Sequence, residues 1–222
     1  MMSVILITVD LHYRRSLHVK ASTISKVNPV QTYMSIIKNP WCRSILIAVH
    51  LEGAFFYGSF AFVGAWIQTE LNLSYMTIGF LLSGFGLGGV FYTISIRKLQ
   101  RILDEVGFVA TGTSILFIFF IGLPMIRSLA FIGLWCVLGG VGFYMLHNTL
   151  QTKATEMYPK ARGTAISVFA MSLFSGQAIG TIIFGILSTA FGYELSFVVV
   201  AFCVLILGAF FMKKLRDNLQ IS

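Results

Sequence analysis

Six long apolar stretches dominate this chain and constrain what it can fold into. They are Ser44–Ile67, Met76–Ile96, Val106–Ile126, Leu129–Leu150, Gly163–Ala190 and Leu195–Met212. Each meets or approaches the roughly 20 residues that a helix needs to cross the hydrocarbon core of a bilayer. The pattern therefore predicts an all-α integral membrane protein with six transmembrane helices.

The basic residues support this count of six. If the stretches cross the bilayer alternately, all Lys and Arg residues except Arg127 lie on one side of it. A missed or invented crossing would destroy this asymmetry. Basic residues in short loops stay cytoplasmic, so we expect a multi-pass protein of the cytoplasmic (inner) membrane with both termini in the cytoplasm.

The spans divide the chain into three parts. Residues 1–43 form an expected cytoplasmic linker with an apolar N-terminal stub, Met1–Val9. Residues 44–213 form the six-span transmembrane domain, and residues 214–222 form a cytoplasmic tail. Within the linker, Val30–Lys38 predicts a short amphipathic helix at the membrane interface, with Val30, Met34 and Ile37 on one side.

Composition excludes several classes of function. The chain is 57% hydrophobic and 11% charged, against roughly 25% charged residues in soluble domains, so we expect the lipid bilayer to cover part of it. The net charge of +8 comes from short loops beside the spans and indicates orientation in the membrane, not nucleic-acid binding. No HExxH, GxSxG, P-loop or CxxC pattern occurs, and no GxGxxG leads from a strand, so we expect no enzyme activity, no metal and no cofactor.

A glycine-rich pattern occurs twice. Leu81–Gly88 and Leu173–Gly180 share a Ser-Gly step and a glycine four residues later, at a spacing of 92 positions. The two stretches would cross the membrane in opposite directions, so the match predicts an inverted repeat of three plus three spans, which is typical of transporters. The alternative is that two glycine-rich helices resemble each other by chance. Glycines four residues apart also let helices approach closely.

Glu52 is the one acid well inside a predicted span. A charged side chain at the centre of a membrane helix costs about 2.5–3.5 kcal/mol on insertion scales. Glu52 therefore faces either a proton or cation pathway, or groups that hold it for packing, or the inner interface. His50, two residues earlier, projects from another face of the helix and is not an obvious partner.

Other polar and aromatic residues inside the spans are candidates for a substrate or proton pathway. Gln177 lies mid-span and either binds substrate or bonds a neighbouring helix. His147 and Asn148 lie near the inner end of the fourth span and either line a vestibule or cap the helix. Phe56 and Tyr57 belong to an aromatic run in the first span, and aromatic side chains in a cavity suit bulky apolar ligands.

One segment carries a family resemblance. Gln151–Gly185 resembles the loop and the following helix in the second half of major facilitator superfamily transporters, especially the drug-efflux type. The matching positions are Ala154, Glu156, Pro159, Arg162, Gly163, Thr164 and Ala165. The stretch Arg97–Arg101 resembles a degenerate form of the basic cytoplasmic loop of that family, so the resemblance implies a gating role for Arg97, Arg101 and Arg162.

The resemblance implies a fold and a function. Family members have twelve spans, and the six found here match the second half, so we expect an N-terminal six-helix half as partner. The implied activity is secondary active transport: proton-coupled export of small amphipathic molecules or drugs by alternating access, as in an antiporter. The expected partners are thus protons, a small-molecule substrate and the missing half. The alternative is a non-transporting membrane protein or an inactive transporter fragment.

Overall fold

The computed structural model describes residues 29–221, and this part of the chain consists of helices joined by short connections, without strands. The α-helices are α2 (Pro29–Lys38), α3 (Pro40–Glu52), α4 (Gly58–Phe60), α5 (Val63–Leu71), α6 (Tyr75–Leu99), α7 (Glu105–Gly122), α8 (Leu129–Glu156) and α9 (Arg162–Ile221). A π-helical turn, η2 (Gly53–Tyr57), joins α3 to α4, and the 3-10 turns η3 (Leu123–Met125) and η4 (Pro159–Ala161) follow α7 and α8. The expected stub Met1–Val9 and most of the linker lie outside the described residues.

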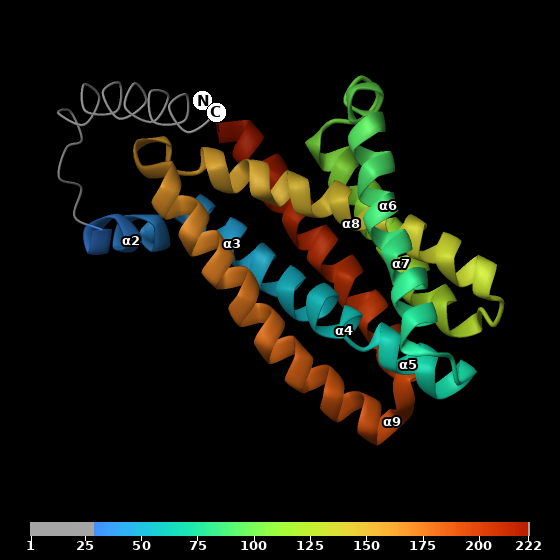
Figure 1. Cartoon of the computed structure of the whole chain (residues 1–222). Helices are drawn as coiled ribbons and strands as arrows, with labels where there is room; N and C mark the ends of the chain where they lie inside the picture. The colour runs from blue at the N-terminus through green and yellow to red at the C-terminus, as the bar shows by residue number, and fades with distance from the viewer. Residues whose placement is uncertain (1–28, 222) are drawn as a thin grey trace, which may run out of the picture.

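Six long apolar helical arms are present, one for each predicted crossing. Five helical segments are long and apolar enough to span a bilayer, and the last of them, Pro159–Gln220, has 62 residues. A straight helix of that length would measure about 90 Å, three times the ~30 Å hydrocarbon core. Figure 1 shows that α9 instead turns back on itself, from its orange arm to its red arm. The turn lies at Gly192, whose φ of 80° and ψ of 166° are not helical.

Local sequence explains where most helices begin and end. The side chain of Asn39 caps α3, Ser74 caps α6 and Asp104 caps α7, each by accepting a backbone N–H of the first turn. Helix α8 continues six residues beyond its predicted end at Leu150, to Glu156, because no helix breaker occurs before Pro159. The expected tail is helical up to Ile221 for the same reason.

Glycines hold α6 against α8. A Cβ atom placed on Gly84 would lie 2.6 Å from the carbonyl oxygen of Gly133, and one placed on Gly88 would meet the carbonyl oxygen of Val137. Real Cβ atoms do not come so close to backbone. The two helices therefore depend on hydrogen atoms at these positions for their contact, which is the packing mode of small-xxx-small motifs in membranes.

The first arm of α9, residues 162–191, packs on α3 and η2 in the same way. Gly176 faces the carbonyl oxygen of His50, and Gly180 faces that of Ala54. In both contacts, glycines four residues apart meet carbonyl groups four residues apart. The second span thus packs on the fourth as the fifth packs on the first. This reciprocity is what an inverted repeat of three spans produces.

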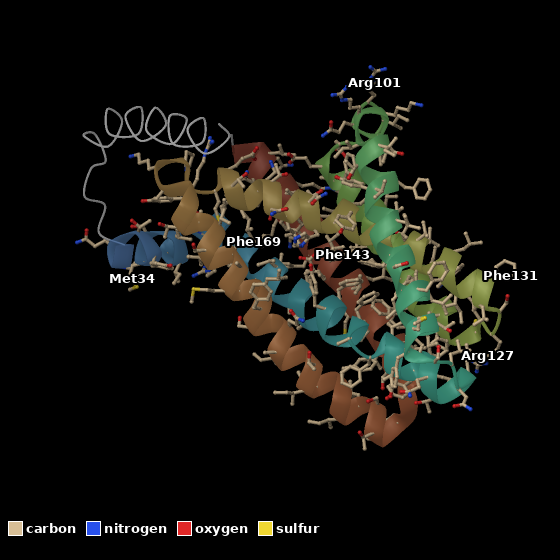
Figure 2. All side chains as sticks on the ribbon, viewed as in Figure 1. Met34, Arg101, Arg127, Phe131, Phe143 and Phe169 are labelled. Atoms are coloured by element: carbon tan, nitrogen blue, oxygen red, sulfur yellow. The ribbon has the colours of Figure 1, made fainter. Side chains whose placement is uncertain are left out.

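Helix α2 covers the end of the bundle where α3 begins. Ile36 is buried, whereas Met34 and Ile37 are exposed on the opposite side of the helix; Figure 2 shows Met34 directed away from the bundle. The predicted helix is therefore present, starting at Pro29. Its exposed apolar side chains suit the interfacial position expected from the sequence.

Candidate functional site

The candidate site is built around a break in the first span. Gly58 donates its backbone N–H to the carbonyl oxygen of Gly53, five residues earlier, so the chain makes one π-helical turn directly after Glu52. π-turns inside α-helices occur frequently at functional sites. Gly53 permits this turn to lie against α9, because a Cβ atom there would overlap the backbone of Leu173.

Glu52 pairs with His147 across the bundle. Oε2 of Glu52 lies 3.0 Å from Nδ1 of His147 on α8. The Glu52 side chain is 0% exposed and that of His147 is 14% exposed. Within residues 31–220, the second carboxylate oxygen of Glu52, Oε1, is buried without a hydrogen-bond partner. An acid, a base and a vacant acceptor therefore meet inside the membrane-spanning bundle.

Aromatic rings surround the imidazole of His147. The ring of Phe143 stacks on it, with centroids 5.1 Å apart and planes 14° apart. Tyr57 presents an edge at 6.3 Å and Phe169 lies at 6.0 Å. An aromatic face attracts a neighbouring cation through its quadrupole.

Phe56 continues this aromatic wall toward the opposite end of the bundle. Its ring is buried and stacks on Phe143 at 4.5 Å, and it also contacts Phe85 at 5.4 Å and Phe120 at 6.0 Å. Figure 2 shows Phe143 near the middle of the molecule, between the helices. Phe56 and Tyr57 lie in the π-turn itself, so a change in that turn would move both rings relative to His147.

The carboxylate–imidazole pair can hold a proton without leaving an unpaired charge. A lone ion at this depth would be costly, and removing one partner of a buried pair costs about 3–5 kcal/mol. A proton shared between Glu52 and His147 offsets that penalty. When the proton leaves or a second one arrives, the site gains a net charge, and Oε1 of Glu52 offers an acceptor for a compensating donor.

The remaining pathway candidates lie apart from this pair. Gln177 is half-buried on α9, where its backbone adjoins Gly53, and its side chain makes no hydrogen bond within residues 31–220. Asn148, adjacent in sequence to His147, lines a different pocket together with Tyr92. The two neighbours that the sequence grouped together therefore serve different parts of the molecule.

The three expected gating arginines lie exposed at helix ends. Arg97 lies in the last turn of α6, Arg101 follows that helix, and Arg162 begins α9. None of them forms a salt bridge with an acid in the part of the chain that the structure describes. Figure 2 shows Arg101 and Arg127 at opposite ends of the bundle, which agrees with the predicted separation of Arg127 from the other basic residues.

The sequence analysis did not predict two clusters of charged residues that the structure contains. At one end, Nζ of Lys153 lies 2.6 Å from Glu105 and 3.1 Å from Glu156, which ties α8 to the start of α7. The Lys153–Glu156 spacing is a helical i,i+3 signal, but nothing local indicates Glu105.

The second cluster forms at the other end of the bundle. Arg127 lies 3.4 Å from Glu194 and 3.7 Å from Glu70, and its guanidinium lies 5.9 Å from the centre of the Trp66 ring. Arg127 therefore links three segments that connect predicted spans: its own, the one with Glu70 and the one with Glu194.

His50 also has its partners on another helix. Its Nδ1 lies 3.1 Å from the carbonyl oxygen of Ser172 and 3.2 Å from Oγ of Ser175 on α9. It does not bond Glu52, as its position on the helix indicated. The hydroxyl of Ser172 in turn donates to the carbonyl oxygen of Leu46, so these bonds reinforce the glycine contacts between α3 and α9.

Comparison with known proteins places the chain in a family. The family model described as "Major Facilitator Superfamily" matches residues 2–172. The chain is 26% identical over 167 residues to the "Uncharacterized MFS-type transporter YceJ" of Bacillus subtilis (strain 168), an alignment that covers 73% of this chain and 41% of that protein. It therefore spans less than half of the relative that it matches. No solved structure matches it. Because the family model covers well over half of its residues, the chain belongs to the Major Facilitator Superfamily, a family of membrane transporters and not of enzymes.

Proposed function

We propose that this chain is the C-terminal six-helix half of a transporter that exports small amphipathic molecules or drugs in exchange for protons. The observation that carries the proposal is the buried Glu52–His147 pair, 3.0 Å apart, with one carboxylate oxygen unpartnered among the described residues. Such a pair holds one proton inside the bundle without a net charge, and a proton that arrives or leaves changes the charge of the site. The aromatic wall of Phe56, Tyr57 and Phe143 beside it suits the apolar body of an amphipathic substrate.

The proposed partner is an N-terminal six-helix half. The chain aligns with less than half of its relative from Bacillus subtilis, which fits a protein that needs further spans. Transport would proceed as the two halves rock against each other around a central site. The reciprocal glycine contacts suit this role, because they join α3 to α9 and α6 to α8 so closely that each pair moves as a unit.

The proposed orientation follows the basic loops. The ends that carry Arg97, Arg101 and Arg162 face the cytoplasm of the inner membrane, and the Arg127 cluster faces outward. Gln177 and Asn148 belong to the proposed substrate pathway, although the second lies in a separate pocket. The three arginines form the proposed cytoplasmic gating region.

Proteoliposomes provide the test. They would contain this chain alone or together with an N-terminal six-helix half, an amphipathic fluorescent dye, and a pH indicator in the lumen. With both halves, we expect an imposed pH gradient to drive dye movement and dye movement to carry protons. Glu52→Gln and His147→Asn, each of which removes one titrating group from the pair, should uncouple the two signals.

Glu70→Gln is the matched control, because it makes the same chemical change in the same helical segment, Pro40–Leu71, 18 residues away and in the exposed Arg127 cluster. It should leave the coupling between dye and protons intact. Unchanged coupling in the Glu52→Gln protein would remove the pair from the mechanism. No dye movement with both halves present, in protein that unfolds cooperatively, would instead identify a non-transporting membrane protein.

A further inference from the structure

A cavity lies between α6, α7 and α8, at the end of the bundle that carries Arg101 (Figure 2). Its volume is about 380 Å³. Its lining combines carboxylates, amides, hydroxyls and apolar side chains: Tyr92, Ile96, Gln100, Leu103, Asp104, Glu105, Phe108, Asn148, Thr149 and Thr152. A concave pocket with a few convergent polar groups is the usual form of a small-molecule site.

The floor of this cavity is aromatic and its mouth is polar. Tyr92 and Phe108 are buried, and their rings meet edge to face at 6.4 Å. Gln100, Asp104 and Thr152 are exposed at the opening. A ligand would therefore place an apolar or aromatic body inward and a polar group at the mouth.

The charges that line the cavity are all negative. The contacts found for Asp104 and Glu105 each use one carboxylate oxygen: Oδ1 of Asp104 accepts the backbone N–H of Gly107 at 2.7 Å, and Oε1 of Glu105 accepts from Lys153 at 2.6 Å. No contact is found for the second oxygen of either carboxylate within the described part of the chain. Lys153, which pairs with Glu105, is 16% exposed but does not line the cavity. Arg97, Lys98 and Arg101 do not line it either and are exposed, so water and salt screen their charges.

Comparison of the two halves of the inverted repeat shows that the fold by itself does not produce a cavity at this position. The glycine contacts make His50 equivalent to Gly133 and Ala54 equivalent to Val137, and the two residues of each pair are 83 positions apart in the sequence. Applied further along the first span, this offset makes Trp66 the equivalent of Asn148 or Thr149 on α8. The two possibilities differ by one residue because the π-turn adds a residue to the first span.

At the opposite end of the bundle a tryptophan takes up the corresponding space. Trp66 is fully buried and packs edge to face on Phe197 at 6.3 Å, and Phe197 contacts Phe184 at 5.1 Å. Phe184 lies 92 positions after Tyr92, the spacing of the glycine pattern. A similar aromatic pair thus lies at both ends, but small polar side chains replace the indole at the end with the cavity.

We propose that this cavity binds a small organic ammonium ion. The two carboxylates and the neighbouring amide and hydroxyl oxygens receive the ammonium group, and the rings of Tyr92 and Phe108 receive its apolar body. The acidic lining disfavours anions, and a neutral molecule of the same shape lacks the charge attraction. The proposal goes beyond the transport function and does not involve Glu52 or His147.

The test measures binding of 2-phenylethylammonium to the purified chain in lipid nanodiscs by calorimetry, with empty nanodiscs subtracted. Saturable binding is expected, with much weaker binding of the neutral analogue 2-phenylethanol. Thr149→Trp, which copies the tryptophan of the other end, should fill the cavity and weaken binding by roughly tenfold or more. Thermal unfolding of this variant reports whether it is folded. Glu52→Gln should bind as the unchanged protein does, which separates this result from the transport proposal.

A second variant tests the charge without filling the space. Asp104→Asn keeps the cap of α7, because asparagine caps helices as well as aspartate does, and should weaken binding by roughly three- to fivefold, the size of an exposed ion pair. Asp217→Asn, an exposed acid that does not line the cavity, is the matched control. Equal binding of the alcohol, undiminished binding in folded Thr149→Trp, or loss of binding in Glu52→Gln that thermal unfolding shows to be folded would each overturn the proposal.

Discussion

Replacing Gly88 by alanine should force α6 away from α8, and the structure sets the size of the effect. A Cβ atom on Gly88 would lie 2.8 Å from Cα of Gly140 and 2.8 Å from the backbone nitrogen of Val141. Contacting carbon atoms prefer about 3.5–4.0 Å, so the helices must separate by roughly 1 Å. Such overpacking typically costs about 1–3 kcal/mol.

Gly86→Ala is the control for this change. Gly86 lies on the same helix, and a Cβ atom there meets nothing within 4 Å. Both substitutions gain the same helix propensity, about 1 kcal/mol, so the difference between the two variants isolates the packing cost. We expect Gly88→Ala to be less stable than Gly86→Ala by about 1–3 kcal/mol.

Reversible unfolding in mixed detergent micelles, followed by circular dichroism, measures this difference. In a membrane protein, helix association depends on packing and hydrogen bonds because lipid is as apolar as the helices. The loss of contact should therefore appear directly in the free energy of unfolding. Equal stability of the two variants would refute the conclusion that bare glycine backbone sets the α6–α8 distance.

Three further changes test other parts of the fold. Arg127→Gln should lower stability by about 1 kcal/mol, the sum expected for weak exposed ion pairs and one cation–π contact, whereas Lys98→Gln, an exposed residue without a salt bridge in the described chain, should change thermal unfolding little. Gly192→Ala should cost about 1–3 kcal/mol because its φ of 80° and ψ of 166° suit glycine alone; a smaller cost would mean that the turn rearranges. Single cysteines placed at Asn72 and Lys160 should react with an impermeant thiol reagent from opposite sides of sealed vesicles, and labelling of both from one side would contradict six crossings.

Much of the candidate site could be named from the sequence but not assembled from it. Glu52 and His147 were both predicted as pathway residues, because charge and imidazole are rare inside apolar spans. Their contact was not predicted, since it joins residues 95 positions apart on two helices whose rotation is set by glycine packing. Asn148 was grouped with His147 from their position in the chain, yet it faces another cavity because adjacent residues on a helix point about 100° apart.

The sequence by itself determined the six long apolar stretches and the uneven distribution of basic residues, and it indicated the inverted repeat, because each depends on a local property: an apolar run long enough for the bilayer, basic loops, or a recurring glycine pattern. Only the tertiary structure decided the π-turn after Glu52, the hairpin at Gly192, the Glu52–His147 pair and the cavity that Thr149 leaves open. These features arise where two helices meet. The contacts there depend on how closely and at what rotation the helices pack, which a single apolar stretch does not encode.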